Sequence, residues 1–159
     1  MQFKDSKTYK NLARSFAGES QAGMRYQLIA KQATAEEYIV LADTIRTIAK
    51  NETYHAKSFY DLLVLKAGNS DNISLDAGYP FRFGTLTENL AFAALDERSE
   101  HEEVYPAFAR EAREEGCEEA AALFERVAGV EKEHEIVFSY LRDALKEGTL
   151  YKRDKPTLW

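Results

Sequence analysis

The sequence predicts an all-α protein, an antiparallel four-helix bundle with one long crossover connection, and three observations support this prediction. Four stretches repeat apolar residues at alternating steps of three and four, which is the spacing of amphipathic helices. Turn-forming residues gather in one long segment, residues 68–84. The chain has 159 residues, enough for one domain with a substantial core, which we expect over residues 1–148.

The first two helices are expected over about 6–33 and 35–67. Thr34, with Glu37 three residues later, forms a capping-box pattern that predicts the start of the second helix. Gly68 favours its end, because glycine readily adopts the left-handed backbone that closes many helices. The short break between the two helices predicts an antiparallel hairpin.

The third helix is expected over roughly 85–115, where Thr85 and Glu88 form another capping-box pattern. Pro106 lacks a backbone N–H and should kink this helix one to two turns after Glu100. The kink is either a tolerated bend or a feature that shapes a site.

The fourth helix is expected over roughly 118–147, between Gly116 and Gly148. It should form a second hairpin with the third helix, so residues 68–84 must run the length of the bundle. Two hairpins joined by one long crossover make the ferritin-like version of the four-helix bundle. A simple up-and-down bundle would instead need a short turn at this point.

Composition excludes several classes of function. A net charge of −6 without a basic stripe argues against nucleic acid as a partner. No apolar run approaches the ~20 residues that span a bilayer, so no membrane partner is expected. The polar start shows no secretory signal, and the single cysteine, Cys117, fits a reducing compartment. We therefore expect a cytoplasmic protein.

Two Glu-x-x-His units lie on the apolar stripes of the second and fourth helices. They are Glu52 with His55, and Glu131 with His134. Residues three apart on a helix are neighbours, so each pair can bind one metal ion. A charge on a core stripe is costly unless it is paired, and a cation is the simplest partner.

The other two helices carry carboxylates on the same kind of stripe. Glu19 lies on the first helix, and Glu97 and Glu100 lie on the third. One glutamate from each helix reaches a similar height, roughly 22–27 Å from its hairpin turn at about 1.5 Å per residue. The candidate metal ligands are therefore Glu19, Glu52, His55, Glu97, Glu100, Glu131 and His134.

Four segments carry a resemblance to a known family: residues 16–22 (FAGESQA), 51–57 (NETYHAK), 100–106 (EHEEVYP) and 130–135 (VEKEHE). Together they resemble the diiron domain of rubrerythrins. The resemblance implies two non-haem iron ions, with bridging, terminal and exchangeable ligands. It implies that Glu52 and Glu131 bridge the irons and that Glu19 and Glu97 are terminal ligands.

The resemblance assigns the remaining site residues as well. His134 would hold one iron, while His55 and Glu100 would exchange at the other as its oxidation state changes. Ferric iron is harder than ferrous iron and favours carboxylate over imidazole. Tyr26 and Tyr105 are similar to the tyrosines that hydrogen-bond ligand carboxylates in this family.

The function that the resemblance implies is a non-haem diiron peroxidase that reduces hydrogen peroxide to water in oxidative-stress defence. Rubrerythrins usually continue into a rubredoxin-like domain, whereas residues 149–159 form a short tail that we interpret as a stub. Electrons would then come from an external donor such as a rubredoxin-like protein. A homodimer or homotetramer is expected. Iron oxidation and storage in a ferritin-like shell is the alternative function.

Overall fold

The computed structural model describes residues 2–69 and 72–150 of the chain. Its helices are α1 (Lys7–Ala35), α2 (Ile39–Ala67), α3 (Leu86–Ser99), α4 (Tyr105–Glu114) and α5 (Glu118–Lys146), with a 3₁₀ turn at Phe3–Asp5 and a π-helical segment at Glu100–Val104. The described residues contain no strand. The predicted all-α class is therefore confirmed.

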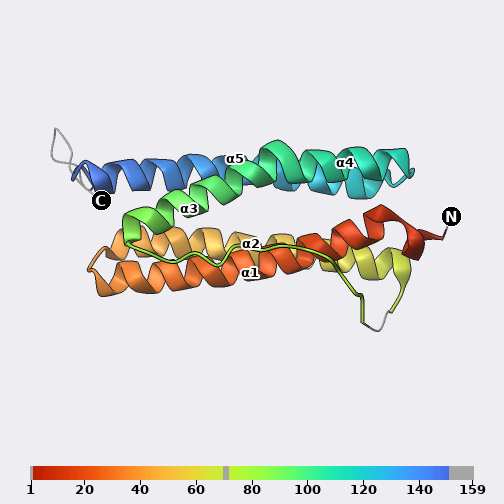
Figure 1. The fold of residues 1–159 in the computed structure, drawn as a ribbon, viewed down its shortest axis with the longest axis horizontal. Coiled ribbons are helices and arrows are strands. Elements are labelled where there is room, and N and C mark those ends of the chain that lie inside the picture. The colour runs from red at the N-terminus through yellow and green to blue at the C-terminus, as the bar shows by residue number, and fades with distance from the viewer. Residues whose placement is uncertain (1, 70–71, 151–159) are drawn as a thin grey trace.

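The helices form two hairpins joined by one long crossover (Figure 1). α1 packs along α2, and α5 packs along both α3 and α4. The connection from α2 to α3 runs beside α1 along most of the bundle, so α2 and α3 point in the same direction (Figure 1). This is the ferritin-like topology that the sequence predicted.

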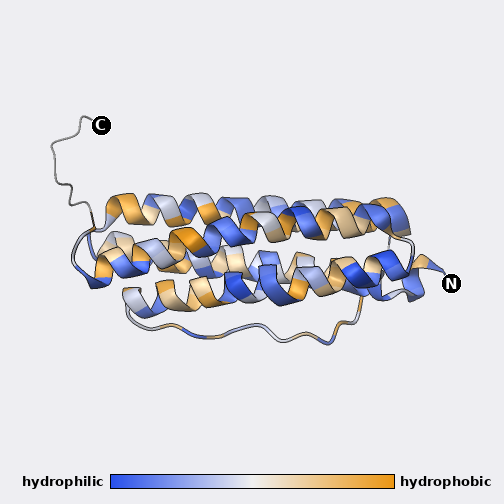
Figure 2. Ribbon diagram, turned by 90° about the horizontal axis from the view of Figure 1, so that it is seen from above, coloured by the Kyte–Doolittle hydropathy of each residue, from blue (hydrophilic) through white to orange (hydrophobic). Residues whose placement is uncertain are grey.

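The apolar core is divided into two clusters, one toward each end of the bundle. The first contains Tyr26, Ile45 and Phe138, and the second contains Phe59 and Phe124. Apolar and polar residues intersperse along every helix, as amphipathic helices require (Figure 2). Buried carboxylates occupy the level between the two clusters.

The two predicted capping boxes have different outcomes. Thr85 and Glu88 form a complete capping box at the start of α3, so that prediction is confirmed. The one at Thr34 and Glu37 is wrong, because α1 continues to Ala35 and α2 begins only at Ile39. The Thr34 hydroxyl donates to a carbonyl of its own helix, and Glu37 has a φ of 67°, which closes the turn after α1.

The third predicted helix is interrupted by the π-helical segment Glu100–Val104. The N–H of Tyr105 donates to the carbonyl of Glu100, five residues earlier, which is the π-helical pattern. Pro106 follows within the first turn of α4. Because proline lacks an N–H and crowds the carbonyl four residues before it, the helix widens ahead of Pro106.

The helix α5 ends at Lys146, shortly before Gly148. Gly148 has a φ of 65°, and the N–H groups of Thr149 and Leu150 both donate to the carbonyl of Ala144. Of the predicted tail, residues 151–159 lie outside the described part of the chain. No helix in the described ranges is long and apolar enough to cross a membrane.

Candidate metal centre

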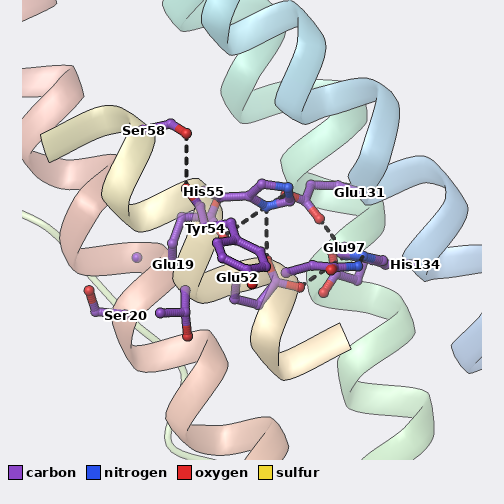
Figure 3. Close-up of polar contacts among 12 residues, drawn as sticks. Glu19, Ser20, Glu52, Tyr54, His55, Ser58, Glu97, Glu131 and His134 are labelled. Carbon is purple, nitrogen blue, oxygen red and sulfur yellow. Dashed lines mark hydrogen bonds and ion pairs between the residues drawn. The ribbon is translucent and has the colours of Figure 1, made fainter. Parts of the chain in front are cut away.

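Each long element of the bundle delivers one glutamate to the level between the apolar clusters. Glu19 comes from α1, Glu52 from α2, Glu97 from α3 and Glu131 from α5, and each is at most 1% exposed. Figure 3 shows these side chains pointing toward one another. They meet because each replaces an apolar residue on a stripe that faces the bundle axis.

The side chains form two overlapping groups of possible ligands. The ligand atoms of each group lie within 4.8 Å of one another: Glu19, Glu52, His55 and Glu131 in the first, and Glu52, Glu97, Glu131 and His134 in the second. Glu52 and Glu131 belong to both groups. Two cations can therefore bind side by side and share two carboxylates.

Both histidines direct Nδ1 into the carboxylates. The Nδ1 of His55 lies 2.8 Å from Glu131 Oε1 and 3.1 Å from Glu52 Oε2. The Nδ1 of His134 lies 2.7 Å from Glu131 Oε2 and 3.0 Å from Glu52 Oε1. Burial lowers the pKa of each imidazole, but hydrogen bonds to these carboxylates outweigh burial and raise both pKa values to about 12.

The pKa values of the buried carboxylates are shifted in different directions. Burial raises the pKa of Glu19 and of Glu97 well above the ordinary value of 4.5. Burial also raises the pKa of Glu52, but hydrogen bonds from His134 and His55 outweigh it and lower that pKa to about 2. The two imidazoles therefore favour the ionised form of Glu52.

The donor set fits divalent transition-metal ions. Glu19 Oε2, Glu52 Oε1, Glu97 Oε2 and Glu131 Oε1 are buried and make no hydrogen bond of good geometry to any described residue. The Nδ1 atom of a histidine lies 2.8–3.8 Å from each of these oxygens. A buried polar atom without a partner costs about 1–3 kcal/mol, and more when it is charged. A cation at each group would satisfy these oxygens, and mixed carboxylate and imidazole ligands suit iron.

Two buried tyrosines hold carboxylates of the centre. The hydroxyl of Tyr26 donates to Glu97 Oε1, and the hydroxyl of Tyr105 donates to Glu19 Oε1. These are the kinds of contact expected from the sequence. Burial raises the pKa of both phenols well above 10, so both remain donors. Each tyrosine thus orients a carboxylate toward the centre.

Glu100 is the one predicted ligand that the structure leaves outside both groups. It begins the π-helical segment and lines a neighbouring cavity together with Ser15 and Tyr105. Burial raises its pKa well above 4.5, and the charges of Glu19 and Glu97 raise it further. Its role as a ligand stays a prediction.

Asn51 is a site residue that the sequence reasoning missed. Its side-chain amide lies 3.2 Å from Nε2 of His134, on the opposite side of the ring from the carboxylates. The contact joins α2 to α5 across 83 residues of sequence. The pattern around Asn51 therefore contained no signal for this contact. His101 lies 2.6 Å from Glu135 and belongs to neither ligand group.

Comparison with known proteins identifies relatives that cover nearly all of the chain. A family model described as Rubrerythrin matches residues 10–142. The rubrerythrin of Clostridium perfringens is 39% identical over 157 residues, which cover 98% of this chain and 80% of the relative. The rubrerythrin of Porphyromonas gingivalis is 38% identical over 157 residues, covering 98% of this chain and 76% of the relative.

Solved structures show the same architecture. A mixed-valence form of nigerythrin aligns with a TM-score of 0.77 at 27% identity, covering 94% of this chain and 73% of that one. The bacterioferritin of Desulfovibrio desulfuricans aligns with a TM-score of 0.80 at 22% identity, covering 90% of this chain and 82% of that one. At that identity the second likeness shows the fold alone.

Proposed function

This chain belongs to the rubrerythrin family of diiron proteins, and on that premise we propose that it is a peroxidase that reduces hydrogen peroxide to water in oxidative-stress defence. The observation that carries the proposal is the pair of ligand groups sharing Glu52 and Glu131. Reduction of peroxide consumes two electrons and two protons and yields two water molecules. Two adjacent ferrous ions supply the two electrons when they are bound.

The proposed ligand set follows the two groups. Glu52 and Glu131 would be shared by the two ions, Glu19 and His55 would complete the first site, and Glu97 and His134 would complete the second. Glu100 and His55 would be alternative ligands at the first site, the carboxylate for the oxidised ion and the imidazole for the reduced one. This exchange requires the Glu100 side chain to turn from the neighbouring cavity into the centre.

The protein's own groups position the ligands and exclude bulk water. The phenol of Tyr105 donates a hydrogen bond to Glu19 Oε1, and the phenol of Tyr26 donates one to Glu97 Oε1. The two apolar clusters seal the centre from both ends of the bundle. Preorganised donors in a dry site act more strongly than they would in water.

The remaining parts of the proposal concern the surroundings of the protein. A separate donor such as a rubredoxin-like protein supplies electrons for turnover, the assembly is a homodimer or homotetramer, and the compartment is the cytoplasm. The alternative, iron storage in a ferritin-like shell, is not favoured, because the relatives at 36–39% identity are rubrerythrins. A molecular mass of hundreds of kilodaltons by size-exclusion chromatography would contradict this choice.

The test is single-turnover oxidation of anaerobically loaded, reduced protein in a stopped-flow instrument. We expect stoichiometric peroxide to oxidise it more than ~100-fold faster than air-saturated buffer, a difference of about 2.7 kcal/mol in barrier. Similar rates with both oxidants would instead indicate an oxidase or ferroxidase.

A further inference from the structure

A cavity of about 320 Å³ adjoins the metal centre on the side covered by the crossover. Its walls come from α1, α3, the π-helical segment, α4 and the crossover, and they include Ser15, Gly18, Tyr79, Glu100, Tyr105 and Phe108. The crossover follows α1 at this level (Figure 1). It is anchored there by the Tyr79 hydroxyl, which donates to the carbonyl of Arg14 at 2.9 Å.

The cavity reaches the centre through two of its wall residues. Tyr105 lines the cavity and donates its hydroxyl hydrogen to Glu19 of the first ligand group. Glu100 lines the cavity as well, and no hydrogen bond to its carboxylate is found among the described residues. These two side chains therefore connect a molecule in the cavity to the first ligand group.

Ser15 provides an independent sign that the cavity binds something polar. It lies one helical turn before Glu19 and is only 4% exposed. Its Oγ is buried and has no hydrogen-bond partner among the described residues, although the residue lines the cavity. A buried hydroxyl without a partner is unfavourable, so a bound molecule that bonds to it would be stabilised.

The charges of the walls indicate which kind of molecule fits. Arg14 is engaged with the carbonyl of Asp76 and with Asn11, and Arg25 is engaged with Asp96 and Gln21. The wall also carries two carboxylates, Asp96 and Glu100, so its formal charges balance and favour neither an anion nor a cation. A small, uncharged molecule that both donates and accepts hydrogen bonds matches these walls.

We propose that this cavity is the docking site for hydrogen peroxide on its way to the metals. The Ser15 hydroxyl and the Glu100 carboxylate are its hydrogen-bonding partners, and Gly18 leaves the space that the molecule occupies. A Cβ on Gly18 would lie 3.6 Å from the Tyr79 ring, so a larger side chain there fills the cavity. The inference rests on the proposed peroxidase function and names its substrate site.

The first test compares two oxidants on reduced, iron-loaded protein. Ser15→Ala should slow oxidation by peroxide about tenfold, the scale of one lost hydrogen bond, and Gly18→Leu should slow it at least as much. Oxidation by ferricyanide, which need not enter the cavity, should be unchanged in both variants. The control is Gly129→Leu, a helical glycine of α5 with open space around it, which should match the wild type.

The second test needs no iron. In a Cys117→Ser background, the thiol of Ser15→Cys should react with methyl methanethiosulfonate in the folded, metal-free protein. Adding Gly18→Leu should slow this labelling about tenfold, and adding Gly129→Leu should not. Circular dichroism verifies that each variant is folded, and Ser15→Ala should be at least as stable as the wild type because it removes an unpartnered hydroxyl.

The outcomes separate the two proposals. A wild-type protein that peroxide oxidises no faster than air refutes the peroxidase function, whatever the variants do. Rapid oxidation of the wild type, with unchanged peroxide rates in both Ser15→Ala and Gly18→Leu, refutes the docking site alone. A thiol at position 15 that does not react in the folded protein also overturns the docking site.

Discussion

Four glutamates in this bundle occupy positions that apolar side chains would otherwise fill. Glu19, Glu52, Glu97 and Glu131 are each at most 1% exposed, and each has one oxygen that makes no hydrogen bond of good geometry to a described residue. Such groups are costly in a core unless a cation compensates them. Substitution of one of these residues should therefore change metal binding more than it changes packing.

Glu131 is the clearest case, because it belongs to both ligand groups and contacts both histidines. Glu131→Ala should lower the ferrous iron bound per chain from two to one or fewer. Metal analysis after anaerobic loading and gel filtration measures this. Glu133→Ala is the matched control, since that side chain is exposed on the same helix. Two ions retained by Glu131→Ala would contradict the shared-ligand assignment.

Asn51 is expected to set the tautomer of His134. In the structure the amide nitrogen Nδ2 of Asn51 lies 3.2 Å from Nε2 of His134. When Nδ1 binds a metal, Nε2 carries the hydrogen, so the amide must turn to accept it through Oδ1. Asn51→Ala should weaken ferrous binding about tenfold, the lower end for residues that orient metal ligands. Asn51→Asp should restore most of the affinity, and the exposed Lys50→Ala is the control. Competition with a chelator measures the affinity for ferrous iron. If Asn51→Ala binds ferrous iron as tightly as the wild type, this role of Asn51 is refuted.

Two local features of the helices matter most at the scale of elements. The π-helical segment places Glu100 in the wall of the cavity instead of in a ligand group.

At one end of the bundle, the carboxylate of Glu115 in the α4–α5 turn accepts hydrogen bonds from the N–H groups of Lys7 and Thr8, 2.9 and 2.8 Å away. This carboxylate caps α1 from the other hairpin and so ties the two hairpins together.

The Glu115 contact predicts a pH-dependent stability. Burial raises its pKa, but the hydrogen bonds from Thr8 and Lys7 outweigh burial and lower the pKa below 4.5. A lowered pKa means that the contribution is present above pH 4.5 and is lost as the pH falls through the folded-state value. In metal-free protein, Glu115→Gln should cost about 1 kcal/mol near neutral pH, typical of a lost helix cap.

Urea unfolding across the pH range measures this contribution. The difference in unfolding free energy between wild type and Glu115→Gln should shrink as the pH falls below 4.5. Glu114→Gln, an exposed neighbour in the same turn, is the control and should leave stability unchanged. A difference that stays constant down to pH 3 would show that the charge of Glu115 is not responsible.

For the molecule as a whole, the metal centre links two hairpins whose apolar clusters lie on either side of it. Metal-free protein should stay helical, since both clusters persist, but it should be less stable. Ferrous iron at 100 times its dissociation constant should add about 2.7 kcal/mol per independent site. For a domain of this size that raises the melting temperature by about 5–10 °C per site.

Anaerobic thermal unfolding with and without ferrous iron measures this stabilisation. Glu131→Ala serves as the control, because its smaller rise would tie the effect to the proposed ligands. A melting temperature that does not respond to iron in the wild-type protein would argue that the buried carboxylates do not bind metal.

The local sequence pattern was sufficient to predict much of the fold. The helical periodicity predicted four helical stretches, and the constant rise per residue predicted that their glutamates would meet at one level. The long segment 68–84 predicted the crossover, because a short turn is needed to join adjacent antiparallel helices. Thr85 and Glu88 formed the expected capping box, whose contacts lie within four residues.

Contacts between distant segments could not be read from the sequence. Thr34 and Glu37 match a capping box, yet packing of the first hairpin placed them at the end of α1. Packing between helices decides three further features: the contact of Asn51 with His134, the unpartnered hydroxyl of Ser15, and the place of Glu100 in the cavity wall. The sequence alone therefore determined the topology and the level at which four glutamates meet, because these follow from local periodicity and spacing. Only the tertiary structure decided which atoms face the centre, because side-chain direction depends on packing between helices.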